Sequence, residues 1–190
     1  MKKSLSLSER QEGRYSGFMR KGYIQVYTGN SKGKTTAALG LALRAAGAGL
    51  KVFIAQFVKK RVYNEHKALE RFKDLITVKR YGKGFLLGRK PAIADIKAAQ
   101  DGLREISKII DSKKYDMIIL DEANVAVRYN LFSADNLLDI MKAKPKQTEL
   151  VITGRYADER VIDAADLVTE MREIKHYIRK GIKARPGIEY

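Results

Sequence analysis

Apolar runs of strand length alternate with helical patterns along the chain from residue 23 onward. Six of these runs are predicted to be strands: residues 23–28, 51–57, 75–81, 115–123, 149–155 and 166–171. Helical patterns occur at residues 34–49, 93–109, 133–143 and 158–165. Strands with continuous apolar cores that alternate with helices are typical of a parallel sheet covered on both faces. The pattern therefore predicts an α/β fold with a mostly parallel central sheet and helices on both faces.

The helical pattern at residues 93–109 repeats its apolar residues at three- and four-residue steps, which is the spacing of one helix face. These residues are Ile93, Ile96, Ala99, Leu103, Ile106 and Ile109. The spacing predicts an amphipathic helix.

The chain is long enough for one well-buried core, with 190 residues of which 45% are hydrophobic. Its first 20 residues are polar and lack periodicity, so we expect a flexible basic arm at 1–20 and a single domain at 21–190. No apolar run approaches the roughly 20 residues that span a bilayer, and the N-terminus lacks the apolar stretch of a signal peptide. We therefore expect a cytoplasmic protein without a membrane partner.

The absence of cysteine excludes disulfides, thiolate metal sites and a cysteine nucleophile. The two histidines, His66 and His176, leave little room for a histidine-rich metal centre. Any metal is therefore expected to be held by oxygen.

The formal net charge of +16 is unevenly distributed. Residues 1–22 carry six basic and two acidic groups, residues 59–90 eleven and three, and residues 172–190 six and two. Residues 91–171 carry eleven basic and fifteen acidic groups. Such basic runs either cover a phosphate-rich site or form solvated surface. A nucleic-acid site needs a basic stripe with stacking aromatics, and the basic charge here is spread over separate segments, so we expect no nucleic-acid partner.

The stretch YTGNSKGKTT, from Tyr27 to Thr36, lies between the first strand and the first helix. A glycine-rich loop at a helix N-terminus directs several backbone N–H groups at one point, and the helix dipole adds positive charge there. Lys34 supplies a mobile cation for phosphates and Thr35 a hydroxyl for Mg²⁺. The common pattern has glycine five residues before Gly33, where this chain has Thr28. The stretch nevertheless predicts a phosphate-binding loop (P-loop).

A second mark of P-loop proteins is an acidic residue at the end of a buried strand, where it can reach the metal of the loop. Asp121 and Glu122 directly follow the apolar residues 117–120. One carboxylate can bind Mg²⁺ directly or through water while the other faces a substrate. Which of the two binds the metal is not decided by the sequence.

Two further segments are candidates for ligand contacts. Arg155 closes the fifth predicted strand, and ligands of open α/β sheets bind at the carboxyl ends of the strands, so Arg155 is a candidate for phosphate binding or a surface arginine. In the glycine-bordered stretch YGKGFLLG, residues 81–88, Phe85 and Leu87 either cover a flat apolar ligand or pack into the core.

Taken together, these motifs resemble those of the ATP:corrinoid adenosyltransferases of the cobalamin pathway, the P-loop type with a RecA-like sheet. The resemblance covers residues 14–190 and includes the shortened loop, the strand-end Asp-Glu, the Thr-Gly-Arg at 153–155 and the C-terminal stretch KHYIRKGIKARPGIEY. It implies transfer of the 5′-deoxyadenosyl group of ATP to the Co(I) of a corrinoid such as cob(I)alamin, with the whole triphosphate as leaving group. Co(I) is itself a strong nucleophile, so the protein needs none of its own.

The resemblance also implies roles for particular residues. Lys34, Thr35 and Glu122 are the expected catalytic residues, Thr35, Asp121 and Glu122 the expected ligands of Mg²⁺ or Mn²⁺, and Phe85 and Leu87 the expected corrinoid contacts. The expected ATP-binding residues are Gly29, Asn30, Ser31, Lys32, Gly33, Lys34, Thr35, Thr36 and Arg155. Lys175 and His176 match the family without an assigned role.

As partners, the resemblance implies a corrinoid, an electron donor such as a reduced flavoprotein, and a second subunit in a homodimer, where the arm of one subunit covers the site of the other. Two other functions are kept as hypotheses, a nucleic-acid-associated P-loop ATPase and a small-molecule kinase. Products separate the three, since adenosyl transfer yields tripolyphosphate, an ATPase yields ADP with phosphate, and a kinase yields ADP without free phosphate.

Overall fold

A computed structural model describes residues 21–59, 61–84, 86 and 89–190, and within them six parallel strands form one sheet in the order β3-β2-β4-β5-β1-β6. Every pairing between neighbouring strands is parallel. The α/β fold and the parallel sheet predicted from the sequence are therefore confirmed. The strands are β1 (Ile24–Thr28), β2 (Val52–Phe57), β3 (Ile76–Tyr81), β4 (Met117–Asp121), β5 (Glu149–Thr153) and β6 (Leu167–Glu170).

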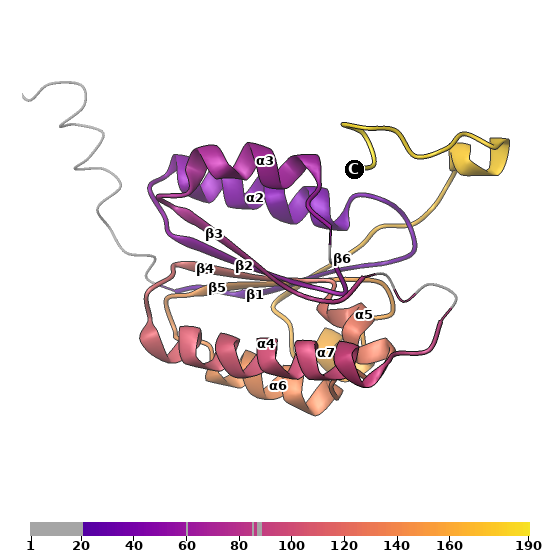
Figure 1. Ribbon diagram of the computed structural model, residues 1–190. Coiled ribbons are helices and arrows are strands. Elements are labelled where there is room, and N and C mark those ends of the chain that lie inside the picture. Colours follow the sequence, from indigo (N-terminus) through magenta and orange to yellow (C-terminus); the bar gives the residue numbers. More distant parts are fainter. Residues whose placement is uncertain (1–20, 60, 85, 87–88) are drawn as a thin grey trace, which may run out of the picture.

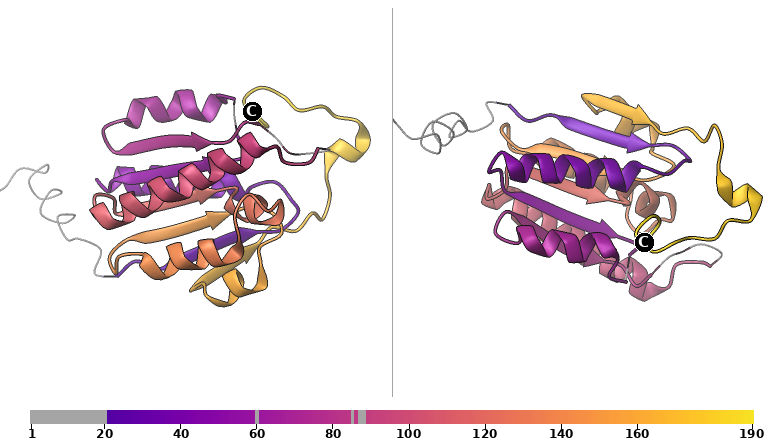
Figure 2. Two further views of the ribbon diagram at one scale, coloured as in Figure 1. Left: turned by 60° about the horizontal axis from the view of Figure 1, so that its bottom comes forward. Right: turned by 90° about the horizontal axis from the view of Figure 1, so that it is seen from above.

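Helices cover both faces of the sheet, as predicted (Figure 1). One face carries α2 (Lys34–Gly47) and α3 (Asn64–Leu69), and the turn η1 (Glu70–Phe72) follows α3. The opposite face carries α4 (Ile93–Ser112), α5 (Ala123–Arg128), α6 (Ala134–Ala143) and α7 (Glu159–Asp163). Beyond β6, the C-terminal segment contains the turn η2 (Tyr177–Lys180) and returns toward the α2 and α3 side of the sheet (Figure 2).

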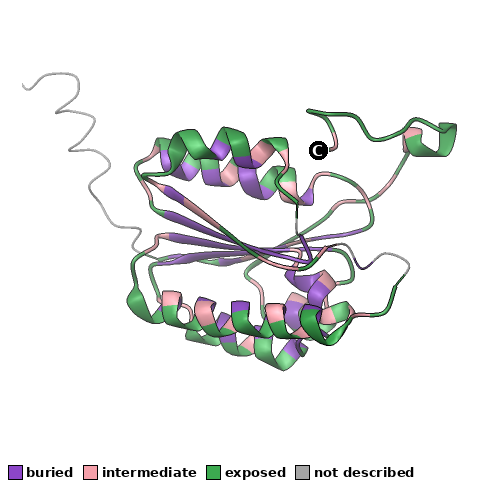
Figure 3. Ribbon diagram, viewed as in Figure 1, coloured by how far each residue is buried: buried purple, intermediate pink, exposed green. Residues whose placement is uncertain are grey.

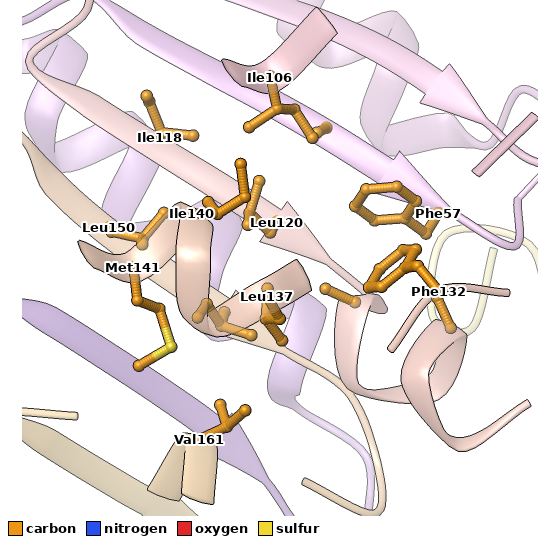
Figure 4. Packing of buried hydrophobic residues seen from close by; sticks show 14 of the residues in the cluster. Phe57, Ile106, Ile118, Leu120, Phe132, Leu137, Ile140, Met141, Leu150 and Val161 are labelled. Atoms are coloured by element: carbon orange, nitrogen blue, oxygen red, sulfur yellow. The ribbon is translucent and has the colours of Figure 1, made fainter. Parts of the chain in front are cut away.

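The side chains of each central strand alternate between two apolar clusters, one under each helical layer. In β4, Ile118 and Leu120 face α4 and α6 (Figure 4), whereas Met117 and Ile119 face α2. Strands β2, β4 and β5 are buried along their whole length (Figure 3). Edge strand β6 is exposed throughout. The buried centre of the sheet therefore holds the strand ends from which the candidate site is built.

Local sequence accounts for several element boundaries. Ser133 caps the N-terminus of helix α6: its hydroxyl accepts a hydrogen bond from the Asn136 N–H, while the Asn136 side chain accepts one from the Ser133 N–H. Helix α4 is amphipathic as expected, with Ala99 and Ile106 fully buried, but Ile93 is 86% exposed and does not belong to its buried face. Ile93 is the first residue of α4 and lies outside the part of the helix that packs on the sheet.

Two helices and several strand ends differ from the prediction; the fifth strand, for example, was predicted to reach Arg155 but ends at Thr153. Helices α3 and α5, of six residues each, were not predicted, whereas the five-residue α7 lies within the helical pattern expected at 158–165. The fourth strand was predicted to reach Ala123 but ends at Asp121, because Glu122 adopts a left-handed φ of 61° and Ala123 begins α5.

Three predictions concern residues outside the described part of the chain: the arm at 1–20, Phe85 and Leu87. In the described residues, the longest helices are too polar or too short to cross a membrane. The described chain starts at Lys21, just before the amino end of β1. The glycine-rich loop follows the carboxyl end of the same strand.

Candidate functional site

The glycine-rich loop connects β1 to α2 at the carboxyl edge of the sheet. Gly29 and Gly33 have φ values of 96° and 113°, which favour glycine. A Cβ atom at Gly29 would lie 2.4 Å from the carbonyl oxygen of Met171, which follows β6. That same oxygen accepts a hydrogen bond from the Ser31 N–H at 3.0 Å. The loop therefore rests directly on the end of β6, and only glycine fits at position 29.

Thr28 occupies the place where the common loop pattern has glycine. Its hydroxyl accepts a hydrogen bond from the Ala157 N–H at 3.4 Å, and its carbonyl oxygen accepts one from the Met171 N–H at 2.9 Å. Thr28 is 9% exposed. The threonine thus joins the start of the loop to the segments that follow β5 and β6.

Lys34 lies across the loop. Its Nζ donates hydrogen bonds to the carbonyl oxygens of Gly29 at 2.7 Å and Ser31 at 2.6 Å, and the residue is 6% exposed. Burial lowers the pKa of Lys34 below its ordinary value, opposed by the charge of Glu122. Its ammonium group therefore braces the loop from inside and adds positive charge at the N-terminus of α2.

Asp121 is the centre of the candidate site. The strand register places it opposite Gln56 of β2, and Thr153 of β5 lies on its other side. Oδ1 accepts hydrogen bonds from the hydroxyls of Thr35 at 2.8 Å and Thr153 at 2.7 Å. Oδ2 accepts them from Gln56 Nε2 at 3.0 Å and Lys59 Nζ at 2.7 Å. The strand-end carboxylate is thus joined directly to the loop through Thr35.

The Gln56 amide is oriented by His66 of helix α3. The Tyr63 N–H donates to His66 Nδ1 at 2.9 Å, so the imidazole proton is on Nε2, which lies 2.5 Å from Gln56 Oε1. Burial lowers the pKa of His66 and favours this neutral form. With its oxygen toward His66, Gln56 directs its NH₂ group at Asp121.

The Lys59–Asp121 pair is buried and ionised. Burial by itself raises the pKa of Asp121, but the charge and hydrogen bond of Lys59 outweigh it and hold the pKa of this carboxyl below its ordinary value. Burial likewise lowers the pKa of Lys59, and the attraction of Asp121 raises it above its ordinary value. Each charge therefore keeps the other ionised in a region that excludes water.

Glu122 lies in a different environment from its neighbour. Its N–H donates to the Thr153 hydroxyl at 3.0 Å. Burial raises the pKa of Glu122, and the charge of Asp121 raises it further. Lys59, Lys34 and Arg155 lower it by smaller amounts. The site therefore contains two adjacent carboxyls whose pKa values are moved in opposite directions.

The C-terminal segment binds Lys32 of the loop. Lys32 Nζ lies 2.6 Å from Glu189 Oε1 and donates to the Tyr177 hydroxyl at 2.8 Å. Tyr177 also donates to Glu189. A cavity of about 260 Å³ between this segment and the start of α3 is lined by Lys59, Tyr63, Glu65, Ala184, Glu189 and Tyr190.

This arrangement of loop, strand-end aspartate and C-terminal segment agrees with comparisons to known proteins. Residues 20–190 match the family model described as ATP:corrinoid adenosyltransferase BtuR/CobO/CobP. The chain belongs to the ATP:corrinoid adenosyltransferase family. A corrinoid adenosyltransferase of Pseudomonas aeruginosa is 33% identical over 171 residues, which are 90% of this chain and 84% of that protein.

Other corrinoid adenosyltransferases are similar to the chain at the same level. One from Sinorhizobium sp is 36% identical over 90% of this chain and 81% of its own length. One from Escherichia coli strain K12 is 34% identical over 90% of this chain and 86% of its own length. The family resemblance expected from the motifs is confirmed, and nothing supports the nucleic-acid-associated ATPase.

The structure brings some of the predicted adenosyltransferase residues together and separates others. Lys34, Thr35 and Asp121 meet at the carboxyl edge of the sheet, with Glu122 beside them. Arg155 is exposed but close enough to affect the pKa of Glu122. Of the other predicted loop residues, Gly29 and Ser31 accept hydrogen bonds from Lys34, Asn30 and Thr36 are exposed, and Lys32 is paired with Glu189.

Sequence reasoning assigned no role to four polar residues that touch or orient Asp121, which are Gln56, Lys59, His66 and Thr153. Gln56 is the one polar residue in the otherwise apolar strand VFIAQF, and this interruption was a usable signal. Lys59 lies two residues beyond the same strand, but the sequence singled it out only as part of the basic run at residues 59–90. Nothing in the sequence around His66 indicates its contact with Gln56, because this contact depends on the position of α3 beside β2.

Replacing Glu122 with glutamine is expected to raise the melting temperature at pH 8. Since the pKa of Glu122 is raised in the folded protein, its ionised form is destabilising above that pKa. This cost disappears below the ordinary value of 4.5, where the carboxyl is protonated in both states. The gain in melting temperature over the wild type should therefore shrink as the pH falls from 8 to 4.

Melting curves of the wild type and Glu122→Gln across this pH range test the expectation. The exposed Glu159→Gln variant is the matched control and should show no such trend. A difference that is constant with pH, or a destabilised Glu122→Gln at pH 8, would contradict the assignment.

Proposed function

We propose that the protein transfers the 5′-deoxyadenosyl group of ATP to the Co(I) of a corrinoid such as cob(I)alamin and releases tripolyphosphate. The observation that carries the proposal is the junction of loop and strand end, where Thr35 of the loop donates to Asp121 of β4 in a chain of this family. In the reaction, a bond forms between cobalt and C5′, and the bond between C5′ and O5′ breaks. The electron pair of the broken bond leaves with the triphosphate.

The chain has to stabilise the negative charge of this leaving group and align the two reacting atoms. The N-terminus of α2, the loop amides and Lys34 provide positive potential at one point. No serine, cysteine or histidine nucleophile is required, because the electron pair for the new bond comes from the cobalt. Arg155 lies at the rim of the same edge and is available to a phosphate group.

The oxygen groups beside the loop fit a magnesium ion. Mg²⁺ prefers hard oxygen ligands and is commonly bound by one or two protein groups with substrate phosphates and water completing its shell. Among the described residues, no group of three or more His, Cys, Asp or Glu side chains forms a metal cage of its own. Thr35 and Asp121 would hold the ion together with the triphosphate, and when bound it would neutralise developing phosphate charge.

For the second substrate, Phe85 and Leu87 remain the proposed corrinoid contacts, and an electron donor such as a reduced flavoprotein would supply Co(I). We place the enzyme in the cytoplasm. We also propose that the enzyme is a homodimer, in which one subunit contributes its arm, residues 1–20, to the site of the other.

Deleting residues 1–20 is expected to weaken corrinoid use more than ATP binding and to leave the melting temperature nearly unchanged. The sequence of the arm is polar and lacks apolar periodicity, and a covering segment acts on substrate access rather than on stability. Steady-state kinetics with each substrate and a melting curve measure the two effects. A collapse of the melting temperature would instead make the arm a structural element.

One anaerobic assay tests the proposed function. ATP, Mg²⁺ and a chemically reduced corrinoid are mixed with the enzyme, the Co–C bond is followed by its absorbance change, and the phosphate products are separated. Intact tripolyphosphate formed in step with the Co–C bond is the expected result. Production of ADP, with or without free phosphate, would reject adenosyl transfer in favour of an ATPase or a kinase.

A further inference from the structure

Lys59 and Asp121 form an ion pair where β2 and β4 end beside the loop. Lys59 Nζ and Asp121 Oδ2 are 2.7 Å apart, and the two side chains are 9% and 1% exposed. The same ammonium lies 3.5 Å from Thr35 Oγ1. One internal cation therefore faces both of the oxygen groups that would hold a divalent ion.

The Asp121 carboxylate is already fully used as an acceptor. Its two oxygens offer about four lone-pair positions, and four donors occupy them. Three of these donors are side chains with short stems on the sheet and helix α2: Thr35, Thr153 and Gln56. Lys59 has a flexible four-carbon stem and is the donor that can leave most easily. A further cation that binds Asp121 directly must therefore displace Lys59.

The backbone before Lys59 is held in an unusual conformation. Val58 has a φ of 60°, in the left-handed region that β-branched residues rarely adopt. Gly82, just after β3, packs closely against this turn. A Cβ atom at Gly82 would lie 2.6 Å from the backbone nitrogen of Lys59. The fold thus maintains a strained turn, supported by a neighbouring backbone, that directs Lys59 inward to Asp121.

We propose that Lys59 is a positioning residue that serves as the resident cation of Asp121 and prevents a divalent cation from binding there without a triphosphate. The inference rests on the proposed function, since it assumes a triphosphate at the loop. Lys34 and Lys59 balance the charges of Asp121 and Glu122, so the site has no excess negative charge to attract a divalent ion alone. The triphosphate supplies this negative charge, so metal and nucleotide bind together.

The test measures Mn²⁺ binding in the absence of ATP and corrinoid, by the electron paramagnetic resonance signal of free Mn²⁺. Lys59→Met is expected to bind Mn²⁺ alone at least about tenfold more tightly than the wild type, because one positive charge next to the ligand oxygens is removed. In the wild type, inorganic tripolyphosphate should increase the Mn²⁺ that is retained with the protein after separation from the solution, compared with the same mixture without tripolyphosphate. Lys51→Met, an exposed lysine just before the amino end of β2, is the matched control and should behave as the wild type.

Equal or weaker Mn²⁺ binding by Lys59→Met would overturn the proposal. A double variant, Lys59→Met with Asp121→Asn, removes both charges and should bind Mn²⁺ no better than the wild type. Tight binding by the double variant would place the metal elsewhere and also reject the proposal.

A measurement on the wild type keeps the test decisive even if Lys59→Met does not fold. Mn²⁺ alone should leave the melting temperature unchanged, and Mn²⁺ with tripolyphosphate should raise it. An equal rise with Mn²⁺ alone would contradict the proposal. None of these readouts depends on corrinoid chemistry, so failure of adenosyl transfer in the product assay remains a separate result.

Discussion

Replacing Lys34 or Thr35 with alanine is expected to lower the rate of adenosyl transfer by at least about a hundredfold while the protein stays folded. Each change removes stabilisation of the charge that develops on the leaving triphosphate, and loss of one such contact typically costs a factor of 10²–10³ in rate. Lys34→Ala also removes the two hydrogen bonds that brace the loop at Gly29 and Ser31. Thr35→Ala breaks the contact between the loop and Asp121.

The rates are measured under anaerobic conditions with saturating Co(I) corrinoid, together with a melting curve for each variant. Arg44→Ala, an exposed residue in the last turn of the same helix, is the matched control and should keep the wild-type rate. Near-normal turnover in Lys34→Ala or Thr35→Ala would show that the triphosphate does not bind at this loop.

A loss of stability of about 3–5 kcal/mol is expected for Asp121→Asn, because removing one partner of a buried ion pair leaves the other charge uncompensated. In this variant the Lys59 ammonium remains buried without its carboxylate. Urea unfolding at pH 7 measures the change in the free energy of unfolding. Asp139→Asn, an exposed aspartate on α6, should change it little.

The pH dependence of this loss has a definite sign. The pKa of Asp121 is lowered in the folded protein, so its contribution to stability is present above the ordinary value of 3.8 and is lost as the pH falls through the folded value. The difference between wild type and Asp121→Asn should therefore shrink in acid. The double variant with Lys59→Met should recover much of the stability at pH 7. An Asp121→Asn protein as stable as the wild type would mean that the pair is not buried in solution.

The sequence was sufficient to predict the six strands, the glycine-rich loop and an acidic strand end near that loop, but it did not decide which of Asp121 and Glu122 meets Thr35. Apolar runs without alternation define buried parallel strands, and Gly-Lys-Thr after one strand and Asp-Glu at the end of another belong at the same edge of such a sheet. Helices α2, α4 and α6 were predicted because their apolar residues recur with a helical period.

The surroundings of Asp121 could not be predicted, because they depend on which strands lie next to β4. Periodicity gives the strands but not their order, and it is this order that places Gln56 on one side of Asp121 and Thr153 on the other. The role of Lys59 depends on one left-handed residue, Val58, that no propensity favours. The partner of Lys32 is Glu189, 157 residues away.

The strand order also determines when the loop can form during protein synthesis. Strand β1, which leads into the loop, pairs only with β5 and β6 among the described strands, so Ile24 lies beside Leu150 and Gln25 beside Leu167. While the ribosome is still adding residues 29–148, β1 therefore has no native neighbour, and pairing over such separations is slow. The glycine-rich loop is translated early in the described chain, and we expect it to be among the last parts of the nascent protein to reach its native structure.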